Sequence, residues 1–212
     1  METTESGLPC KRPYELGKRR EASDRTREAV LSSARELLES GGVRDLTMEA
    51  LAKASGVTRQ TIHNLFGTRT GVLEALFDRI AADAGMMRMR EVMTSGDAEG
   101  MLAAFVALFS GFWKKDRLLL KRIHGIAAID PEFGRAVEAR NQRRKMAASR
   151  VIERIHAGRQ GIDPGEIGRK IAILLAMTSF EFFDALAESC GSVEEAGEWI
   201  YPMVRKAVSP EL

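Results

Sequence analysis

Residues 46–76 read LTMEALAKASGVTRQTIHNLFGTRTGVLEAL, and this stretch decides the fold. Its apolar residues recur at helical spacing, and Thr47 and Thr58 stand where a hydroxyl can cap the first turn of a helix. The pattern breaks at Gly56, where glycine can adopt the left-handed backbone of a tight turn. Two short helices joined in this way are typical of a helix-turn-helix, whose second helix is free to enter a DNA major groove.

Helical patterns continue on both sides of this stretch, and no segment has a convincing strand pattern. About nine helices are expected, at about 24–40, 47–55, 58–66, 68–84, 97–114, 116–128, 131–158, 164–189 and 192–208, the first of them capped by Asp24. The predicted fold class is all-α. We expect a flexible basic arm at 1–22, a helix-turn-helix DNA-binding domain at 23–84 and a C-terminal helical bundle at 85–212.

The composition limits what the chain can be. Its 212 residues are 44% hydrophobic and 29% charged, as in a globular protein. The longest apolar stretches, 101–109 and 171–180, fall short of the roughly 20 residues that cross a bilayer. The first residues lack the pattern of a signal peptide, so a cytoplasmic protein is expected. Cys10 and Cys190 match neither a zinc site nor a disulfide scaffold, and no metal or cofactor is expected.

The central stretch resembles the TetR family of bacterial transcription regulators. The resemblance is carried by Leu51-Ala52-Lys53-Ala54-Ser55-Gly56-Val57-Thr58 across the turn and by Phe66-Gly67-Thr68-Arg69 after it, in the family's order over about 60 residues. One departure affects specificity. Where the family usually has Gly-Thr-Leu-Tyr-Tyr-His, this chain has Gln60-Thr61-Ile62-His63-Asn64-Leu65, so the operator of a relative cannot be transferred to it.

The helix-turn-helix supplies the candidate DNA contacts. Arg59 and Gln60 are long enough to reach base edges, while His63 can reach a phosphate or a base. Residues at the starts of neighbouring helices are expected to hold the phosphate backbone. The candidates are Thr47, Thr58, Arg59, Gln60, Thr61, His63, Asn64 and Arg69. An ordinary solvated helix residue is the alternative for each. The basic run 18–20 could follow the phosphates, or it could be a solubilising tail.

The C-terminal half has helices that are apolar on more than one face, notably 101–113 and 171–183, and such helices must bury more than one face. The resemblance implies an effector pocket and a homodimer interface on the last two long helices. The pocket candidates are Phe105, Phe109, Trp113, His124, Met177 and Phe180, with Met86 and Met87 at the connection to the first domain. The interface candidates are Phe182, Phe183, Leu186, Trp199, Ile200 and Met203. Plain intrachain core is the alternative for each of these residues.

The arginines of the segment 131–158 are interpreted as a solvated face, with an anionic effector as the alternative. No catalytic constellation is apparent, so no enzymatic activity and no catalytic residue are predicted. The resulting hypothesis is a DNA-binding transcription regulator, by family default a repressor. It would bind a near-palindromic operator as a dimer and be released by a small, largely apolar effector. A helical protein-interaction module that does not read DNA is the alternative, and an enzyme on a helical scaffold is a third.

Overall fold

The structure is a computed structural model that describes residues 13–41, 43–94, 96–158, 161 and 163–209. Over these residues the chain forms eleven α-helices and two 3₁₀ turns, and it contains no strand, so the expected all-α class is confirmed. The elements are α1 (Pro13–Ser40), η1 (Val43–Asp45), α2 (Met48–Ser55), α3 (Arg59–Phe66), α4 (Arg69–Asp83), η2 (Met86–Arg88), α5 (Met89–Thr94), α6 (Ala98–Lys115), α7 (Arg117–Ile129), α8 (Pro131–Ile155), α9 (Pro164–Met177), α10 (Phe180–Cys190) and α11 (Val193–Val208).

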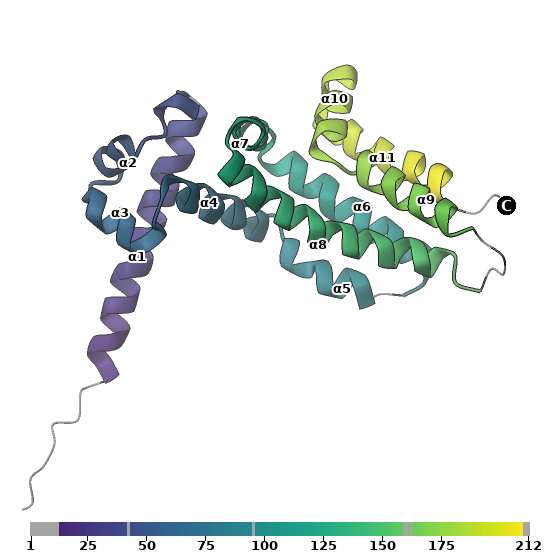
Figure 1. Cartoon of the computed structure of the whole chain (residues 1–212), viewed down its shortest axis with the longest axis horizontal. Coiled ribbons are helices and arrows are strands. Elements are labelled where there is room, and N and C mark those ends of the chain that lie inside the picture. The colour runs from purple at the N-terminus through teal and green to yellow at the C-terminus, as the bar shows by residue number, and fades with distance from the viewer. Residues whose placement is uncertain (1–12, 42, 95, 159–160, 162, 210–212) are drawn as a thin grey trace, which may run out of the picture.

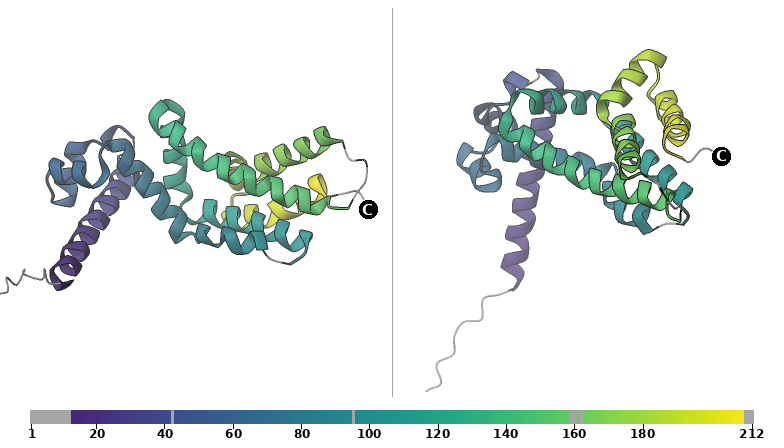
Figure 2. Two further views of the ribbon diagram at one scale, coloured as in Figure 1. Left: turned by 60° about the horizontal axis from the view of Figure 1, so that its bottom comes forward. Right: turned by 45° about the vertical axis from the view of Figure 1, so that its right-hand side comes forward.

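Helices α1 to α3 lie at one end of the molecule, and α9 to α11 gather towards the other (Figure 1). Helix α4 leads from the first group to the middle of the molecule, where it packs on α8, as the two further views also show (Figure 2). The long helices α6 and α8 pack on one another, and α11 packs on both α6 and α9. A rod-like bundle thus carries a small group of helices at its tip.

The helix-turn-helix forms as the sequence predicts. The hydroxyl groups of Thr47 and Thr58 accept hydrogen bonds from the Ala50 and Thr61 amides, each at 3.1 Å, and so cap α2 and α3. Gly56 ends α2 in the left-handed conformation, with φ of 69°. Leu51 and Ile62 are fully buried and pack these short helices onto α1 and α4. Short helices of this length owe their stability to such packing.

The first helix is longer than expected. It begins at Pro13, so Asp24 is not its cap, and residues 13–22 are helical, in contrast to the flexible arm expected there. Residues 1–12 of that arm lie outside the described residues. The segment 14–22 is rich in Glu, Leu, Lys and Arg, which are strong helix formers, and Pro suits the first turn of a helix. Residues 17–22 are exposed, and an exposed helix needs no apolar stripe.

Two further boundaries differ from the prediction. The expected helix 164–189 is split into α9 and α10, because Ser179 caps a new helix by accepting a hydrogen bond from the Phe182 amide at 3.1 Å. The connection at 85–96 contains the turn η2 and the short helix α5, where only a boundary was expected. Both differences add elements to the all-helical fold and leave its class unchanged.

Candidate nucleic-acid interface and cavity

Helix α3 presents a polar face at the tip of the molecule. Ile62 points into the core, while Arg59, Gln60, His63 and Asn64 are exposed. A shallow surface hollow of about 780 Å³ runs beside this face. Its lining residues are Met48, Thr58, Arg59, Gln60, His63, Gly67, Thr68 and Arg69. The structure therefore brings most of the predicted DNA-contact residues to one surface.

Two of these side chains are held in place by neighbours on the same surface. Arg59 forms an ion pair with Glu49 of α2, with 2.7 Å between Nη1 and Oε1, although both side chains are about two-thirds exposed. The Gln60 amide donates to Asn64 Oδ1 at 2.9 Å. Exposed pairs of this kind are weak and exchange readily with water or another acceptor. Arg59 and Gln60 are thus paired in the structure but remain accessible.

The corner between α3 and α4 is tight. A Cβ atom placed on Gly71 would lie 1.9 Å from the carbonyl oxygen of Phe66, a backbone atom that cannot move away. On the other side of the corner, the guanidinium of Arg27 lies 4.6 Å from the centroid of the Phe66 ring. Contacts from α1 and α4 therefore fix the angle at which α3 is presented.

Arg69 makes a contact that the sequence did not predict. Its Nη2 lies 2.8 Å from Asp130 Oδ2, at the start of α8. The pKa of Asp130 is lowered below its usual value, mainly because its carboxylate accepts a hydrogen bond from the Phe133 amide, with a further contribution from Arg69. Arg69 thus joins the helix-turn-helix end of the molecule, α1 to α3, to the bundle, which is a contact beyond the expected one with phosphate.

Further polar contacts tie α1 and α4 to the bundle. Arg35 of α1 binds Asp116 through two hydrogen bonds of 2.8 Å. Arg140 of α8 binds Asp78 of α4, with 2.7 Å between Nη2 and Oδ1. Arg122 of α7 donates to the carbonyl oxygen of Leu38. The helix-turn-helix end is therefore connected to the bundle at several separate points.

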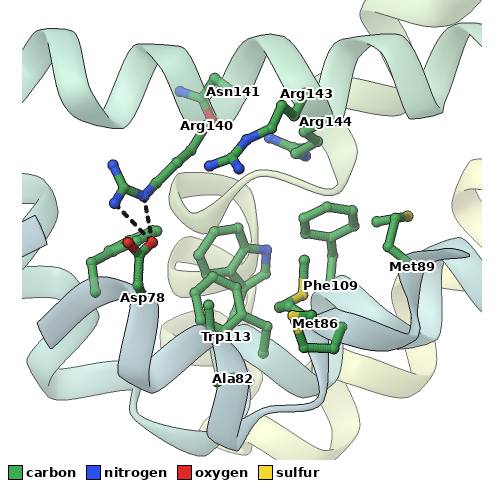
Figure 3. Close-up of a pocket in the computed structure, with 14 residues that line it drawn as sticks. Asp78, Ala82, Met86, Met89, Phe109, Trp113, Arg140, Asn141, Arg143 and Arg144 are labelled. Atoms are coloured by element: carbon green, nitrogen blue, oxygen red, sulfur yellow. Dashed lines mark hydrogen bonds and ion pairs between the residues drawn. The ribbon is translucent and has the colours of Figure 1, made fainter. Parts of the chain in front are cut away.

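A cavity of about 460 Å³ lies between α4, η2, α6 and α8, within the size range of small-molecule sites. One side is aromatic and sulfur-rich, with Phe109, Trp113, Met86 and Met89, and the other is formed by arginines of α8 (Figure 3). Its full lining is Phe77, Asp78, Ala81, Ala82, Met86, Met87, Met89, Phe109, Phe112, Trp113, Arg140, Asn141, Arg143 and Arg144.

Of the six predicted pocket residues, Phe109 and Trp113 line this cavity, and Phe105, His124, Met177 and Phe180 do not. Phe105 is fully buried against the Phe109 ring, with 4.9 Å between centroids. His124 and Phe180 stack on one another behind Trp113, with centroids 4.7 Å apart. Met177 is half-buried against the core. The two methionines expected at the connection, Met86 and Met87, do line the cavity.

The sequence did not identify these arginines as pocket residues, because their helix is charged overall. Arg140, Arg143 and Arg144 all line the cavity. Arg143 is exposed there, but Arg140 and Arg144 are only partly exposed, so the interpretation of this segment as a solvated face is wrong at those two positions. Spacing of three and four residues places them on one side of α8. Arg144 Nη2 donates to Thr178 Oγ1 at 2.7 Å, and burial lowers the pKa of Arg144 to about 10. Its guanidinium therefore stays charged at neutral pH.

The predicted interface residues divide into two groups. Phe183 and Ile200 are fully buried within the chain, so they cannot lie at a surface between subunits, and this part of the prediction is wrong. Phe182 and Leu186 are half-buried against the same core. Trp199 and Met203 remain 44% and 38% exposed. Periodicity identified the apolar helix but not which of its faces points inward.

Neither a membrane span nor a metal cluster is found in the part of the chain that the structure describes. No helix there is long and apolar enough to cross a membrane. No group of three or more His, Cys, Asp or Glu side chains in that part of the chain could hold a metal ion.

Residues 30–76 match the family model of the bacterial regulatory proteins of the tetR family. The transcriptional regulator EthR of Mycobacterium tuberculosis is 28% identical over 109 residues, which are 50% of this chain and 50% of that protein. The regulator AlkX of the same organism is 31% identical over 109 residues, 49% of this chain and 50% of that protein. The chain thus spans about half the length of the curated relatives it matches.

The likeness in fold extends over most of the chain. NalD of Pseudomonas aeruginosa, the secondary repressor of the MexAB-OprM multidrug efflux pump, superposes with a TM-score of 0.66 at 17% identity, covering 90% of this chain and 98% of that one. At this identity the superposition shows a shared fold and nothing more specific.

Proposed function

Because residues 30–76 match the model of the bacterial regulatory proteins of the tetR family, we propose that the chain is a sequence-specific, DNA-binding transcription repressor of that family. The observation that carries the proposal is the exposed face of α3. Arg59, Gln60, His63 and Asn64 project from this helix, which is capped by Thr58 and packed onto its neighbours. Arg and Gln are the side chains that read guanine and adenine in a major groove.

The protein would act as a homodimer, because a dimer presents two reading helices to successive major grooves about 34 Å apart. An apolar face on α9 and α11 supports this arrangement. Its exposed members are Ala172, Ile173, Ala176, Trp199, Pro202 and Met203, at helical spacing on each helix. Trp and Met are enriched at the centres of interfaces. The interface proposed here is thus narrower than the sequence suggested and is centred on Trp199 and Met203.

Release from DNA would follow binding of a small molecule in the cavity between α4 and α8. The cavity touches Phe77 and Asp78 of α4, and α4 continues directly into the tight corner that holds α3. A ligand that favours a different tilt of α4 would therefore move the reading helix. A coupling free energy of about 1–3 kcal/mol would change operator affinity by about 5- to 150-fold.

Residues 23–84 would form the DNA-binding domain and residues 85–212 the effector-binding and dimerisation domain, with the basic residues before 23 contacting phosphates. The relatives are named as regulators and not as enzymes, which supports a role without catalysis. Since a bacterial operator is accessible in the cytoplasm, we place the protein there. A protein-interaction module that does not read DNA is the competing function.

Selection of bound sequences from a random duplex pool tests the proposal. The purified protein should enrich an inverted repeat at about 150 mM salt, which suppresses non-specific phosphate binding. Enrichment should be lost with Arg59→Ala combined with Gln60→Ala. It should persist with Arg88→Ala combined with Gln142→Ala, which makes the same chemical change at exposed positions far from α3. No enrichment by the unmodified protein would favour the interaction module.

A further inference from the structure

The cavity between α4 and α8 has two chemically different sides, and the charged side carries an excess of positive charge. Its lining contains three arginines and one carboxylate, that of Asp78. Arg140 is matched, because it binds Asp78 and also approaches Glu74, with 3.6 Å between Nη1 and Oε2. Arg143 and Arg144 are left without a carboxylate partner among the described residues.

Arg143 and Arg144 differ in how they are held. Arg143 is exposed at the cavity and makes no hydrogen bond or ion pair with any residue that the structure describes. Arg144 donates from Nη2 to two neutral oxygens, those of Leu175 and Thr178, while its Nε is shut off from solvent and has no partner in the described chain. Both side chains extend from α8 towards the aromatic side of the cavity (Figure 3). The guanidinium of Arg144 lies 4.9 Å from the centroid of the Phe109 ring.

The carboxylate that attracts Arg144 is already hydrogen-bonded to another side chain. Glu181 attracts Arg144 electrostatically, but its carboxylate is bound by His124, with 3.0 Å between Nδ1 and Oε1. Burying a charge without a paired partner costs free energy. An anion entering the cavity would remove that cost, and the planar guanidinium fork matches the two oxygens of a carboxylate.

We propose that the ligand of this cavity is an amphipathic anion, whose carboxylate binds Arg143 and Arg144 and whose apolar body lies on Phe109, Trp113 and the methionines of η2 and α5. Methionine adapts its shape to varied apolar groups, so the tail can vary. A cationic ligand would face the two unmatched arginines and is disfavoured. The ligand's role as an effector rests on the proposed function, whereas its binding does not.

Isothermal titration of the full-length protein with three ligands of equal chain length tests the head group. The ligands are decanoate, 1-decanol and decyltrimethylammonium, each below its micelle concentration. The mutational test uses Arg143, because this residue is exposed and its replacement leaves the core intact. Replacement of Arg144 would disturb the core. Arg150→Gln is the matched control, since Arg150 is exposed on the same helix and does not line the cavity.

Decanoate should bind at least about 10-fold more tightly than 1-decanol, and Arg143→Gln should weaken decanoate alone by about 10-fold, as expected for loss of one charge-assisted contact. Arg150→Gln should bind like the unmodified protein. Equal binding of decanoate and 1-decanol, insensitivity to Arg143→Gln, or binding of none of the three would overturn the proposal. Because the titration contains no DNA, these outcomes are independent of whether the operator selection succeeds.

Discussion

Arg35 in α1 and Asp116 between α6 and α7 form a bidentate ion pair, with 2.8 Å from Nη1 to Oδ1 and 2.8 Å from Nη2 to Oδ2. The residues are 81 positions apart, and they connect the helix-turn-helix end of the molecule to the bundle. The hydrogen bond and charge of Asp116 raise the pKa of Arg35, although partial burial opposes the effect. Paired contacts of this geometry are stronger than single ones.

A double-mutant cycle with Arg35→Gln and Asp116→Asn should give a coupling free energy of about 1 kcal/mol in urea unfolding, at the upper end for pairs that are partly exposed. The same cycle on Arg88 and Glu91, which are both 75% exposed, should give nearly zero. Equal coupling in the two cycles would show that the first pair does not join the two halves of the molecule.

Gly71→Ala should disrupt the corner between α3 and α4. The added Cβ would overlap the carbonyl oxygen of Phe66, so we expect a loss of about 1–3 kcal/mol in the free energy of unfolding and a loss of operator binding. Gly111→Ala in α6 is the control, because a Cβ there meets open space. That substitution should stabilise the protein by about 0.5–1 kcal/mol. Similar effects of both changes would contradict the close approach.

Thr178→Val should destabilise the fold, because it removes one of the hydrogen-bond acceptors of the Arg144 guanidinium. The Thr178 hydroxyl accepts from Arg144 Nη2 at 2.7 Å and donates to the Leu174 carbonyl at 2.6 Å. Valine keeps the shape but removes the acceptor, so the free energy of unfolding should fall by about 1–3 kcal/mol. Thr94→Val removes an exposed hydroxyl from α5 and should change it little. An equally small change at Thr178 would argue against the role of its hydroxyl.

Glu181 should make stability depend on pH in the acid range. The hydrogen bond from His124 is the main cause that lowers the pKa of Glu181 from 4.5 to about 2. A lowered pKa means that the stabilisation is present above pH 4.5 and is lost as the pH falls towards 2. Because the Glu181 side chain is 71% exposed, solvent screening keeps the contribution small.

Glu181→Gln should therefore flatten the fall in urea midpoint between about pH 4.5 and pH 3, the upper part of the titration of this carboxyl. Glu153→Gln removes a carboxylate that makes no ion pair with a described residue, and it should leave the slope as it is. An unchanged slope in Glu181→Gln would mean that the contact with His124 does not stabilise the fold.

The exposed apolar face of α9 and α11 should be an interface between two copies of the chain. Met203→Glu should shift the mass measured by light scattering from dimer to monomer, because a charge at the centre of an apolar interface is poorly solvated. Ile129→Glu changes a residue that is 74% exposed at the end of α7, away from this face, and should leave the dimer intact. If the Met203→Glu variant remains a dimer, the interface lies elsewhere on the chain.

The sequence predicted the helix-turn-helix well because its determinants are local. The caps Thr47 and Thr58 and the turn at Gly56 act within a few residues of their own position, so they can be read without tertiary structure. The corner at Ser179 was missed because apolar residues continue through it, although the capping hydroxyl was present in the sequence. The extension of α1 was missed because an exposed helix needs no apolar stripe.

The cavity was predicted less well, for a different reason. Periodicity shows that a helix face is buried but not which neighbour covers it. The sequence therefore could not tell that Phe109 lines the cavity whereas Phe105 lies in the core. The role of Arg143 and Arg144 depends on α8 crossing α6, which brings together positions more than 30 residues apart. Such contacts follow from the arrangement of whole helices and leave no mark in a charged segment.

The two tryptophans of the chain stand at the two places where it is proposed to meet other molecules. Trp113 lines the cavity and donates to the Thr178 carbonyl at 2.9 Å, while Trp199 lies on the exposed face of α11. Each indole is therefore a separate fluorescent reporter. With Trp199→Phe, the emission of the remaining indole follows occupancy of the cavity. With Trp113→Phe, it follows self-association, so the two events can be timed independently without an added dye.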